Sequence, residues 1–346
     1  MGSSFTISAD AVTQVGRVQW DRRIKLVVGD DAGNAIDLSD LQVRFTVTSA
    51  TATTLKRLEA RIYNPAPETS RKIEKEFTRV ELSVGYAGLS QPSNAPQGNL
   101  PGHFESESPL GLIFTGSVTQ VRRGKENAVD RYLDIIGQDG DRMFNFATMN
   151  QPVAANSTIG DRFNQVLKLL QPFGVTRGSV PDLNALNPTK FPRGVAMQGM
   201  ARDVLRDLAK SLGCDWCVED GKINLIPYDS VLPGGAIILD PTSGMIDAPE
   251  QTIDGLVVRC LMNYNVKPGR VIQVPKELVN TDTIKLPITA NDYVPDLSAN
   301  DQYKCYAVVH SGDTRGNEWS TTATCEALDP TTGKTVASQK RNEAVS

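Results

Sequence analysis

The chain has few of the residues on which enzymes depend. Its 346 residues include two histidines, His103 and His310, so a Ser/His/Asp triad would have to draw its base from these two. No G-x-S-x-G motif surrounds a serine. The phosphate-binding patterns G-x-G-x-x-G and G-x-x-x-x-G-K-[ST] are absent as well. These absences argue against the hydrolase and nucleotide-binding classes that use such motifs.

Cysteine is also sparse, and the five cysteines form an odd set, which suits a protein made in a reducing cytosol. Cys214-Asp-Trp-Cys217 has the spacing of a redox or zinc motif. A redox pair needs a helix N-terminus to lower the thiol pKa, but this pair follows a predicted helix. A zinc site needs four ligands, and the sequence has no second C-x-x-C and no H-x-x-x-H. We interpret both residues as strand residues in a core.

Neither strong charge nor a long apolar run is present. The chain has 36 Lys and Arg against 40 Asp and Glu, a net charge of -4, whereas a dedicated nucleic-acid-binding protein is normally basic. No stretch approaches the roughly 18 consecutive apolar residues of a transmembrane helix. The N-terminus lacks a basic region followed by an apolar segment, so we expect no Sec-type signal peptide.

What the first 150 residues do contain is strand patterning. In "LQVRFTVT", Leu41 to Thr48, apolar and polar residues alternate strictly, and "VELSVGYAG" from Val80 repeats the pattern. Such alternation with Gly and Asp turns predicts antiparallel sheet, closed as a barrel or sandwich. Residues 89–109 have four prolines and no periodicity, and they predict a long surface loop that contains His103.

The period changes near residue 157. Thr158 and Asp161 form a capping-box pattern, and a helix face follows it, made of Ile159, Phe163, Val166, Leu167 and Leu170. A second helix is predicted to end at Gly213; its apolar residues are Met200, Val204, Leu205, Leu208 and Leu212. Asp220-Gly221 then predicts a two-residue hairpin turn.

Strand patterns resume after residue 230, and residues from Trp319 to Ala327 alternate cleanly. The sequence therefore predicts a mainly β protein with a small α+β insert, and not a doubly wound α/β fold. The predicted domains are a first β domain (1–154, with the Pro-rich loop 89–109), the insert (155–230), a second β domain (231–328) and a polar C-terminal tail (329–346).

Two short stretches resemble functional sites. "VVHSGDTRGNEW" contains His310, Ser311, Asp313 and Arg315, which are catalytic residue types. Ser311-Gly312-Asp313 is also a turn signature, so we interpret the stretch as a hairpin in which Asp313 accepts bonds from nearby amides. On that strand we expect Ala307 and Val309 to share a face with Cys305.

Asp139-Gly140-Asp141 suggests calcium, but the D-x-[DN]-x-[DN]-G…E loop is missing. We interpret this stretch as a tight turn. The sequence thus predicts no catalytic, cofactor-binding or metal-binding residues, and no enzymatic activity.

Several longer stretches resemble bacteriophage tail baseplate hub proteins, the late control protein D-like or tail-tube-initiator hub family. "LEARIYNPAPETSRKIEKEFTRVELSVGYAG" and "IFTGSVTQVRRGKENAVDRYLDIIGQDGD" are similar to the family's first strands. "GMARDVLRDLAKSLGCDWCVEDGKINLIP" resembles its insert. "LDPTSGMIDAPEQTIDGLVVRCLMNYNVKPGRVIQV" and "YKCYAVVHSGDTRGNEWSTTATCEAL" resemble its second β domain. The matches occur in order and cover most of the chain.

This resemblance implies two tube-type β-barrel domains and a homotrimer whose six barrels match a sixfold tail tube and a threefold central spike. It implies partners: the tail tube protein or its distal adaptor ring, the central spike protein, the tape measure protein and other baseplate proteins. Phage DNA would cross the channel without specific binding. The protein would be made and assembled in the host cytoplasm and end in the virion baseplate.

Two alternatives stay open at this stage. A cell-wall (peptidoglycan) hydrolase of the tail tip would belong to a different class. An equivalent hub of a phage-like contractile injection machine would keep the same mechanism.

Overall fold

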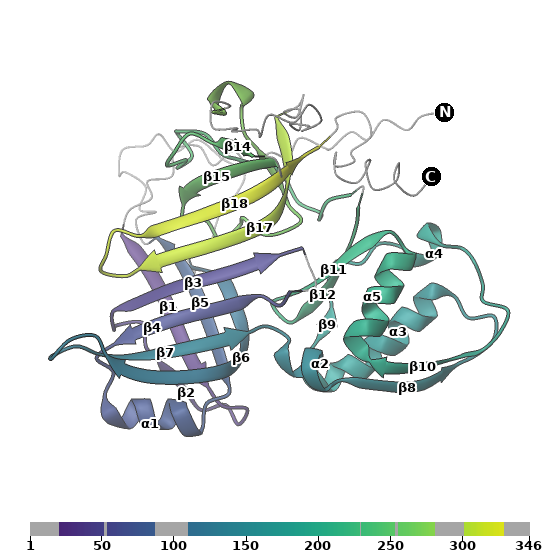
Figure 1. The fold of residues 1–346 in the computed structure, drawn as a ribbon, viewed down its shortest axis with the longest axis horizontal. Helices are drawn as coiled ribbons and strands as arrows, with labels where there is room; N and C mark the ends of the chain where they lie inside the picture. Colours follow the sequence, from purple (N-terminus) through teal and green to yellow (C-terminus); the bar gives the residue numbers. More distant parts are fainter. Residues whose placement is uncertain are drawn as a thin grey trace, which may run out of the picture.

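The computed structural model describes residues 21–51, 54–86, 110–228, 230–252, 255–280 and 301–328, so the predicted loop 89–109, His103 and the tail 329–346 lie outside the described residues. The protein is mainly β, as predicted; helices α2 to α5 gather in one module, and α1 lies apart from them against the first β region (Figure 1). The first β region consists of β1 (Arg22–Gly29), β2 (Ala35–Asp37), β3 (Val43–Ala50), β4 (Arg57–Tyr63), α1 (Pro67–Lys75), β5 (Arg79–Tyr86), β6 (Leu110–Lys125) and β7 (Arg131–Gln138).

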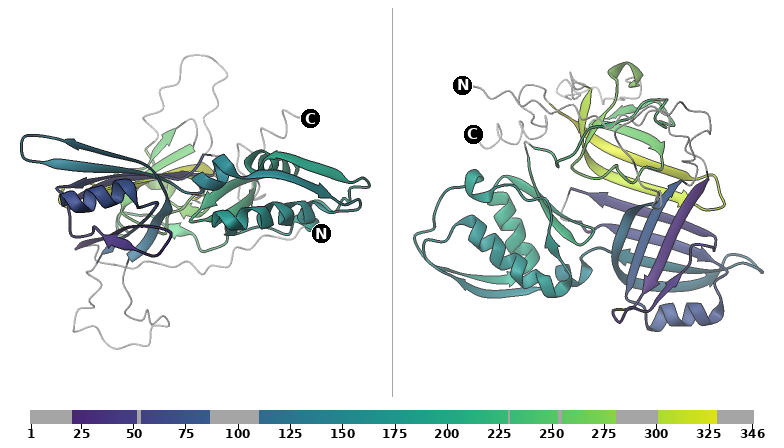
Figure 2. Two further views of the ribbon diagram at one scale, coloured as in Figure 1. Left: turned by 90° about the horizontal axis from the view of Figure 1, so that it is seen from below. Right: turned by 180° about the vertical axis from the view of Figure 1, so that it is seen from behind.

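This region is a curled antiparallel sheet in the order β3-β4-β7-β6-β5-β1-β2. Strands β1, β5 and β6 cross behind β3, β4 and β7, as the view from behind shows (Figure 2). The alternation predicted for β3 is present, because its residues are alternately buried and exposed from Val43 onward. The apolar face of the curled sheet encloses the core, which α1 covers at one end with the buried Ile73.

The second β region follows the insert in the chain. It consists of β13 (Ile237–Ile238), β14 (Glu250–Thr252), β15 (Gly255–Leu261), β16 (Val271–Gln273), the 3-10 helix η2 (Lys276–Leu278), β17 (Gln302–Asp313) and β18 (Trp319–Ala327). Its core is separate from that of the first region and includes Leu256, Val258, Ile272 and Tyr303.

Strand β17 belongs to both β regions. Its first residues, Gln302 to Lys304, pair with β16, whereas Ala307 to Asp313 pair with Ala50 to Arg44 of β3. Within the described residues, thirteen strands therefore form one continuous sheet. The core of the first region also extends across the join, because Trp319 of β18 and Met262 pack in it.

The insert has its own core. Its elements are α2 (Asp141–Phe146), β8 (Thr148–Val153), α3 (Ile159–Leu170), the 3-10 helix η1 (Gln171–Phe173), β9 (Thr176–Arg177), α4 (Leu183–Leu186), β10 (Val195–Met200), α5 (Ala201–Ser211), β11 (Cys214–Glu219) and β12 (Lys222–Pro227). Strand β8 pairs with β10 of the insert. The core of the insert therefore includes Met149 and Val153 of β8, and also Met143 of α2, although all three precede the predicted boundary at 154.

The local predictions for the insert are confirmed. Thr158 and Asp161 form the capping box of α3. The whole predicted apolar face of that helix is buried. Gly213 follows α5 with a φ of 64°, the left-handed conformation of a helix end. Asp220 and Gly221, with φ of 53° and 71°, form the turn between β11 and β12.

One strand prediction is wrong. The residues that share the buried face with Cys305 are Val308 and His310, not Ala307 and Val309, which are half-buried. The reason is a β-bulge between Cys305 and Ala307, which reverses the alternation beyond it. On β18 the predicted face is confirmed, since Trp319, Thr321, Ala323, Cys325 and Ala327 are all buried. Among the described residues, no helix is long and apolar enough to cross a membrane.

Candidate functional site

The histidine predicted to lie in a hairpin is enclosed in the sheet. His310 pairs with Thr321 across β17 and β18, is 4% exposed, and has its Nδ1 2.9 Å from the Thr321 Oγ1. Burial, together with the charges of Lys56 and Lys267, lowers the pKa of His310 to about 3. Ser311 points to the opposite face, because neighbouring strand residues alternate. The two side chains therefore do not form a nucleophile–base pair.

Asp313 has the turn role that the sequence predicts. Its Oδ1 accepts the backbone N–H groups of Arg315 and Gly316, both at 2.9 Å, while its Oδ2 accepts Arg44 Nε at 2.7 Å. Burial alone would raise the pKa of Asp313, but these hydrogen bonds lower it on balance. The carboxylate is thus fixed by the loop and by a neighbouring strand.

The two other candidate motifs are structural. Cys214 and Cys217 lie three residues apart on β11 and so point to opposite faces; both are buried, and burial raises the pKa of Cys217 to about 12. Asp139 is buried, and both of its carboxylate oxygens accept the Gly221 N–H at 3.2 Å. Over the described ranges, no group of three His, Cys, Asp or Glu side chains could hold a metal ion.

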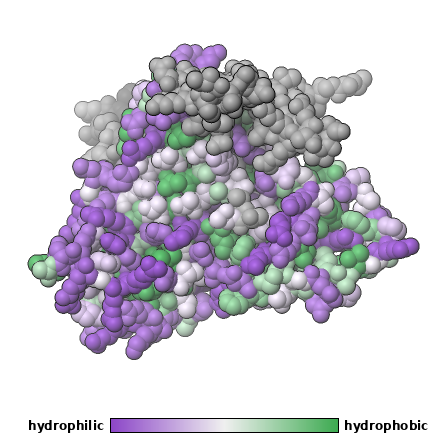
Figure 3. All heavy atoms as spheres, viewed as in Figure 1, coloured by the Kyte–Doolittle hydropathy of each residue, from purple (hydrophilic) through white to green (hydrophobic). Residues whose placement is uncertain are grey.

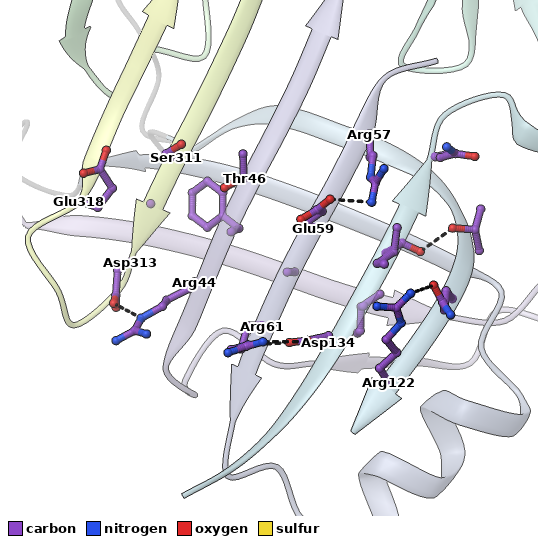
Figure 4. A pocket seen from close by; sticks show the side chains of 18 residues that line it. Arg44, Thr46, Arg57, Glu59, Arg61, Arg122, Asp134, Ser311, Asp313 and Glu318 are labelled. Atoms are coloured by element: carbon purple, nitrogen blue, oxygen red, sulfur yellow. Dashed lines mark hydrogen bonds and ion pairs between the residues drawn. The ribbon is translucent and has the colours of Figure 1, made fainter. Parts of the chain in front are cut away.

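The largest functional candidate is a surface. We call it the polar sheet face: a hollow of about 840 Å³ on the outer side of the sheet, opposite the core of the first region (Figure 4). Both β regions contribute to it, because β17 and β3 are paired. Its polar side chains come from Arg44, Thr46, Arg57, Glu59, Arg61, Thr119, Gln120, Arg122, Asp134, Gln138, Ser311, Asp313 and Glu318.

The charges of the polar sheet face are balanced, and three of its four arginines have a carboxylate partner. The lining contains four arginines and four carboxylates, so its formal charge is zero. Arg61 binds Asp134 through two hydrogen bonds, of 2.7 and 3.0 Å. Further ion pairs join Arg44 to Asp313, Arg57 to Glu59, and Arg259 to Glu318. Hydrophilic side chains dominate this side of the molecule over β4 and β7 (Figure 3).

The exposed ion pairs of this face add little to folding stability. In the Arg57–Glu59 and Arg259–Glu318 pairs both side chains are at least 41% exposed, and such exposed pairs stabilise by about 0–1 kcal/mol each. The carboxylates of the other two pairs, Asp134 and Asp313, are only 24% and 9% exposed. The main contribution of the exposed pairs is therefore to the chemical character of the face.

The face is hydrophilic. Arg44, Arg57 and Arg61 are each paired with a carboxylate. Arg122 instead donates a hydrogen bond to the Gln120 side chain at 2.7 Å.

A second cluster of charges lies where the two β regions meet the insert. We call it the junction cluster: Lys56, Asp139, Glu219, Asp220 and Lys267. Lys56 Nζ lies 2.7 Å from Glu219 and 2.9 Å from Asp220, and Lys267 Nζ lies 2.7 Å from Asp220. The Lys56 side chain is only 3% exposed.

Each part of the chain contributes to the junction cluster. Lys56 precedes β4 and Asp139 follows β7, Glu219 and Asp220 lie at the β11–β12 turn, and Lys267 precedes β16. Burial lowers the pKa of Lys56, but Glu219 and Asp220 raise it by more. Burial also raises the pKa of Asp139 to about 6. The cluster holds two ammonium groups and three carboxyl groups, and Asp139 has no ion pair of its own within it.

The sequence predicted part of these sites. Alternation placed Arg44 and Thr46 on the solvent side of β3. No local signal distinguishes Lys56, since its partners lie more than 160 positions away.

Comparison with known proteins identifies the fold. No protein-family model matches the chain, and no curated protein matches it. Solved structures do match. A tail protein from Neisseria meningitidis MC58 aligns with a TM-score of 0.56 at 11% identity, over 91% of this chain and 98% of that one. The 43 kDa tail protein of prophage MuSo2 from Shewanella oneidensis aligns with a TM-score of 0.54 at 9% identity, over 91% and 99%. Over most of its length, the chain therefore has the fold of these two tail proteins.

Proposed function

We propose that the chain is the structural hub of a phage tail baseplate, which joins the sixfold tail tube to the threefold central spike. The observation that carries the proposal is the shared fold, since the alignment with two tail proteins spans 91% of the chain. The fused β regions support it further. Each chain contributes two joined β regions. Three chains around one axis would therefore present six β regions to the sixfold tail tube and three equivalent chains to the threefold spike.

In this proposal the polar sheet face lines the channel through which DNA leaves the particle. A lining rich in free Lys and Arg would hold phosphates through counterion release and slow the passage of DNA. The balanced charge of the face, and the pairing of three of its four arginines with carboxylates, suit a surface that DNA passes without binding.

The proposed partners are two more copies of the chain, the tail tube protein or its distal adaptor ring, the central spike protein, the tape measure protein and other baseplate proteins. The protein would be made in the bacterial host cytoplasm and act in the virion tail. An equivalent place in a phage-like contractile injection machine would use the same surfaces.

We further propose that the chain has no enzymatic activity. His310 is enclosed and faces away from Ser311, which argues against a hydrolytic site in the hairpin. The competing candidate is a cell-wall hydrolase of the tail tip. A zymogram on bacterial cell wall separates the two, because a cleared band at the position of the purified protein supports the hydrolase.

The assembly itself is tested by native mass measurement, on the protein alone and mixed with a candidate central spike protein. Three copies of the 37.5 kDa chain are expected, either alone or once the spike is added. A stable hexamer of six identical chains, or a monomer under both conditions, contradicts the proposed hub.

A further inference from the structure

Two cysteines face each other in the core of the second β region. Cys305 on β17 and Cys325 on β18 are direct cross-strand partners. Both are free thiols, and both are fully buried. The pair lies at the β-bulge where β17 leaves β16 and begins to pair with β3. These two residues are therefore placed at the join between the two β regions.

The backbone hydrogen bonds define the geometry of this pair. The Cys305 N–H donates to the Arg270 carbonyl at 2.8 Å, and the Cys305 carbonyl accepts the Gly269 N–H at 2.7 Å. Both main-chain groups of Cys305 thus point away from β18. Cys305 and Cys325 are consequently a non-hydrogen-bonded antiparallel pair, in which the Cα atoms lie about 4.5 Å apart. Disulfides span Cα separations of about 4.4 to 6.8 Å, so the backbone can accept one here without moving apart.

The two side chains share the core of the second β region. The Cys305 Sγ lies 3.5 Å from the Ala307 carbonyl oxygen. Interaction with the Cys305 thiol, followed by burial, raises the pKa of Cys325 well above its ordinary value. No other cysteine is the direct cross-strand partner of Cys305 or Cys325, although Cys260 packs in the same core. Cys260 pairs with Thr321, which is four positions along β18 from Cys325, or about 13 Å at roughly 3.3 Å per residue. Cys214 and Cys217 lie in the insert.

We propose that Cys305 and Cys325 form a redox modification site, which closes to a cross-strand disulfide after the protein leaves the reducing cytosol. The oxidant class is a low-molecular-weight disulfide such as oxidised glutathione. One thiolate attacks it and releases one reduced thiol; the second cysteine then attacks the mixed disulfide and releases the other. The two protein thiols lose two electrons and two protons, which the oxidant takes up as two thiols.

The closed bond would hold the shared strand. It would tie β17 to β18 beside the bulge, so that β17 cannot shift against its hairpin partner while it also pairs with β3. The site is built for slow closure, because the pair is buried and the pKa of Cys325 is raised, so little thiolate is present. Only the change of compartment rests on the proposed virion location; the chemistry of the pair does not.

The test uses the full chain, purified reduced and folded. It is incubated with oxidised glutathione, quenched with iodoacetamide, digested without reductant and analysed by mass spectrometry. We expect a cross-linked peptide pair containing Cys305 and Cys325, an intact mass lower by two hydrogens, and a rise in Tm of a few degrees that dithiothreitol reverses. Cys260→Ala, the matched control, should keep the cross-link, and Cys325→Ala should abolish it.

Three results would overturn the proposal: stable glutathione adducts on the two separate cysteines, a cross-link to Cys260, or thiols that are oxidised only after the protein is unfolded in urea. The wild-type chain alone decides between these outcomes, so a variant that fails to fold leaves the test intact. Native mass measured before and after oxidation keeps this test apart from that of the hub, since the number of copies does not depend on the disulfide.

Discussion

The junction cluster makes a prediction about a single carboxyl group. Asp139 is buried among two ammonium groups and two other carboxylates. The cluster thus has one carboxyl group more than it has ammonium groups, and Asp139 is the carboxyl group without an ion pair. Burial raises its pKa from 3.8 to about 6, while the Gly221 amide and Lys56 lower it and Asp220 and Glu219 raise it. We predict that Asp139→Asn stabilises the protein at about pH 7.5.

The magnitude follows from the pKa. Each unit of difference between folded and unfolded chains corresponds to about 1.36 kcal/mol, so a rise from 3.8 to about 6 corresponds to about 3 kcal/mol at neutral pH. The neutral amide avoids this cost, but it is a weaker acceptor for the Gly221 N–H than a carboxylate. We therefore expect a net gain of about 1–3 kcal/mol.

The sign of the pH dependence is also fixed. Because the pKa of Asp139 is raised in the folded state, its contribution to the free energy of unfolding is fully present below about pH 4. That stability is lost as the pH rises through about 6. The advantage of Asp139→Asn should thus be largest at about pH 7.5 and disappear near pH 4. Asp220 and Asp313 have lowered pKa values, so their own losses occur below about pH 4 and outside this window.

Thermal denaturation at several pH values between about 4 and 7.5 measures this difference. Asp141→Asn is the matched control, since Asp141 lies two positions away and hydrogen-bonds Asn145 outside the cluster. Its variant should lose up to about 1 kcal/mol, because Asp141 lies in the first turn of α2, and should show no gain in stability at about pH 7.5. The reasoning is refuted if Asp139→Asn is less stable than the parent at pH 7.5, or if the difference is the same across the range.

Further substitutions test other contacts by thermal or urea denaturation. Lys56→Ala removes a buried cation from two partly buried carboxylates and should cost about 3–5 kcal/mol; a cost below about 1 kcal/mol would mean that the junction is solvated. Trp319→Ala should cost about 3–5 kcal/mol, because the ring packs edge-on against Phe45 at 5.6 Å. Asp313→Ala should cost about 1 kcal/mol per lost amide bond. His310→Ala should lower stability without the loss of any hydrolytic activity; an unchanged melt with a lost activity would restore the hydrolase reading.

Local sequence signals predicted the elements that local contacts create. Thr158 and Asp161 form a cap within one helical turn, and Asp220-Gly221 adopts two positive φ values within one turn, so both can be read from neighbouring residues. The alternation of β18 was confirmed for the same reason, since a regular strand places every second residue on one face.

The sequence-based predictions were wrong or incomplete where contacts between distant segments determine the conformation. The extra residue at the bulge of β17 appears when that strand changes its partner from β16 to β3, and β3 lies about 260 positions earlier in the chain. Alternation alone therefore placed Ala307 and Val309 on the wrong face. The junction cluster is invisible in the sequence because Lys56, Asp220 and Lys267 meet only in the folded protein.

The central claim is that three copies surround a channel and turn the polar sheet face toward it. An electron cryo-microscopy map of the assembled particle, or of the trimer with its spike, tests this most directly. The account predicts three chains around one axis, with Thr46, Glu59 and Asp134 facing the lumen. A map in which these side chains are buried against another protein or lie on the outer surface, or in which the number of chains is not three, would contradict it.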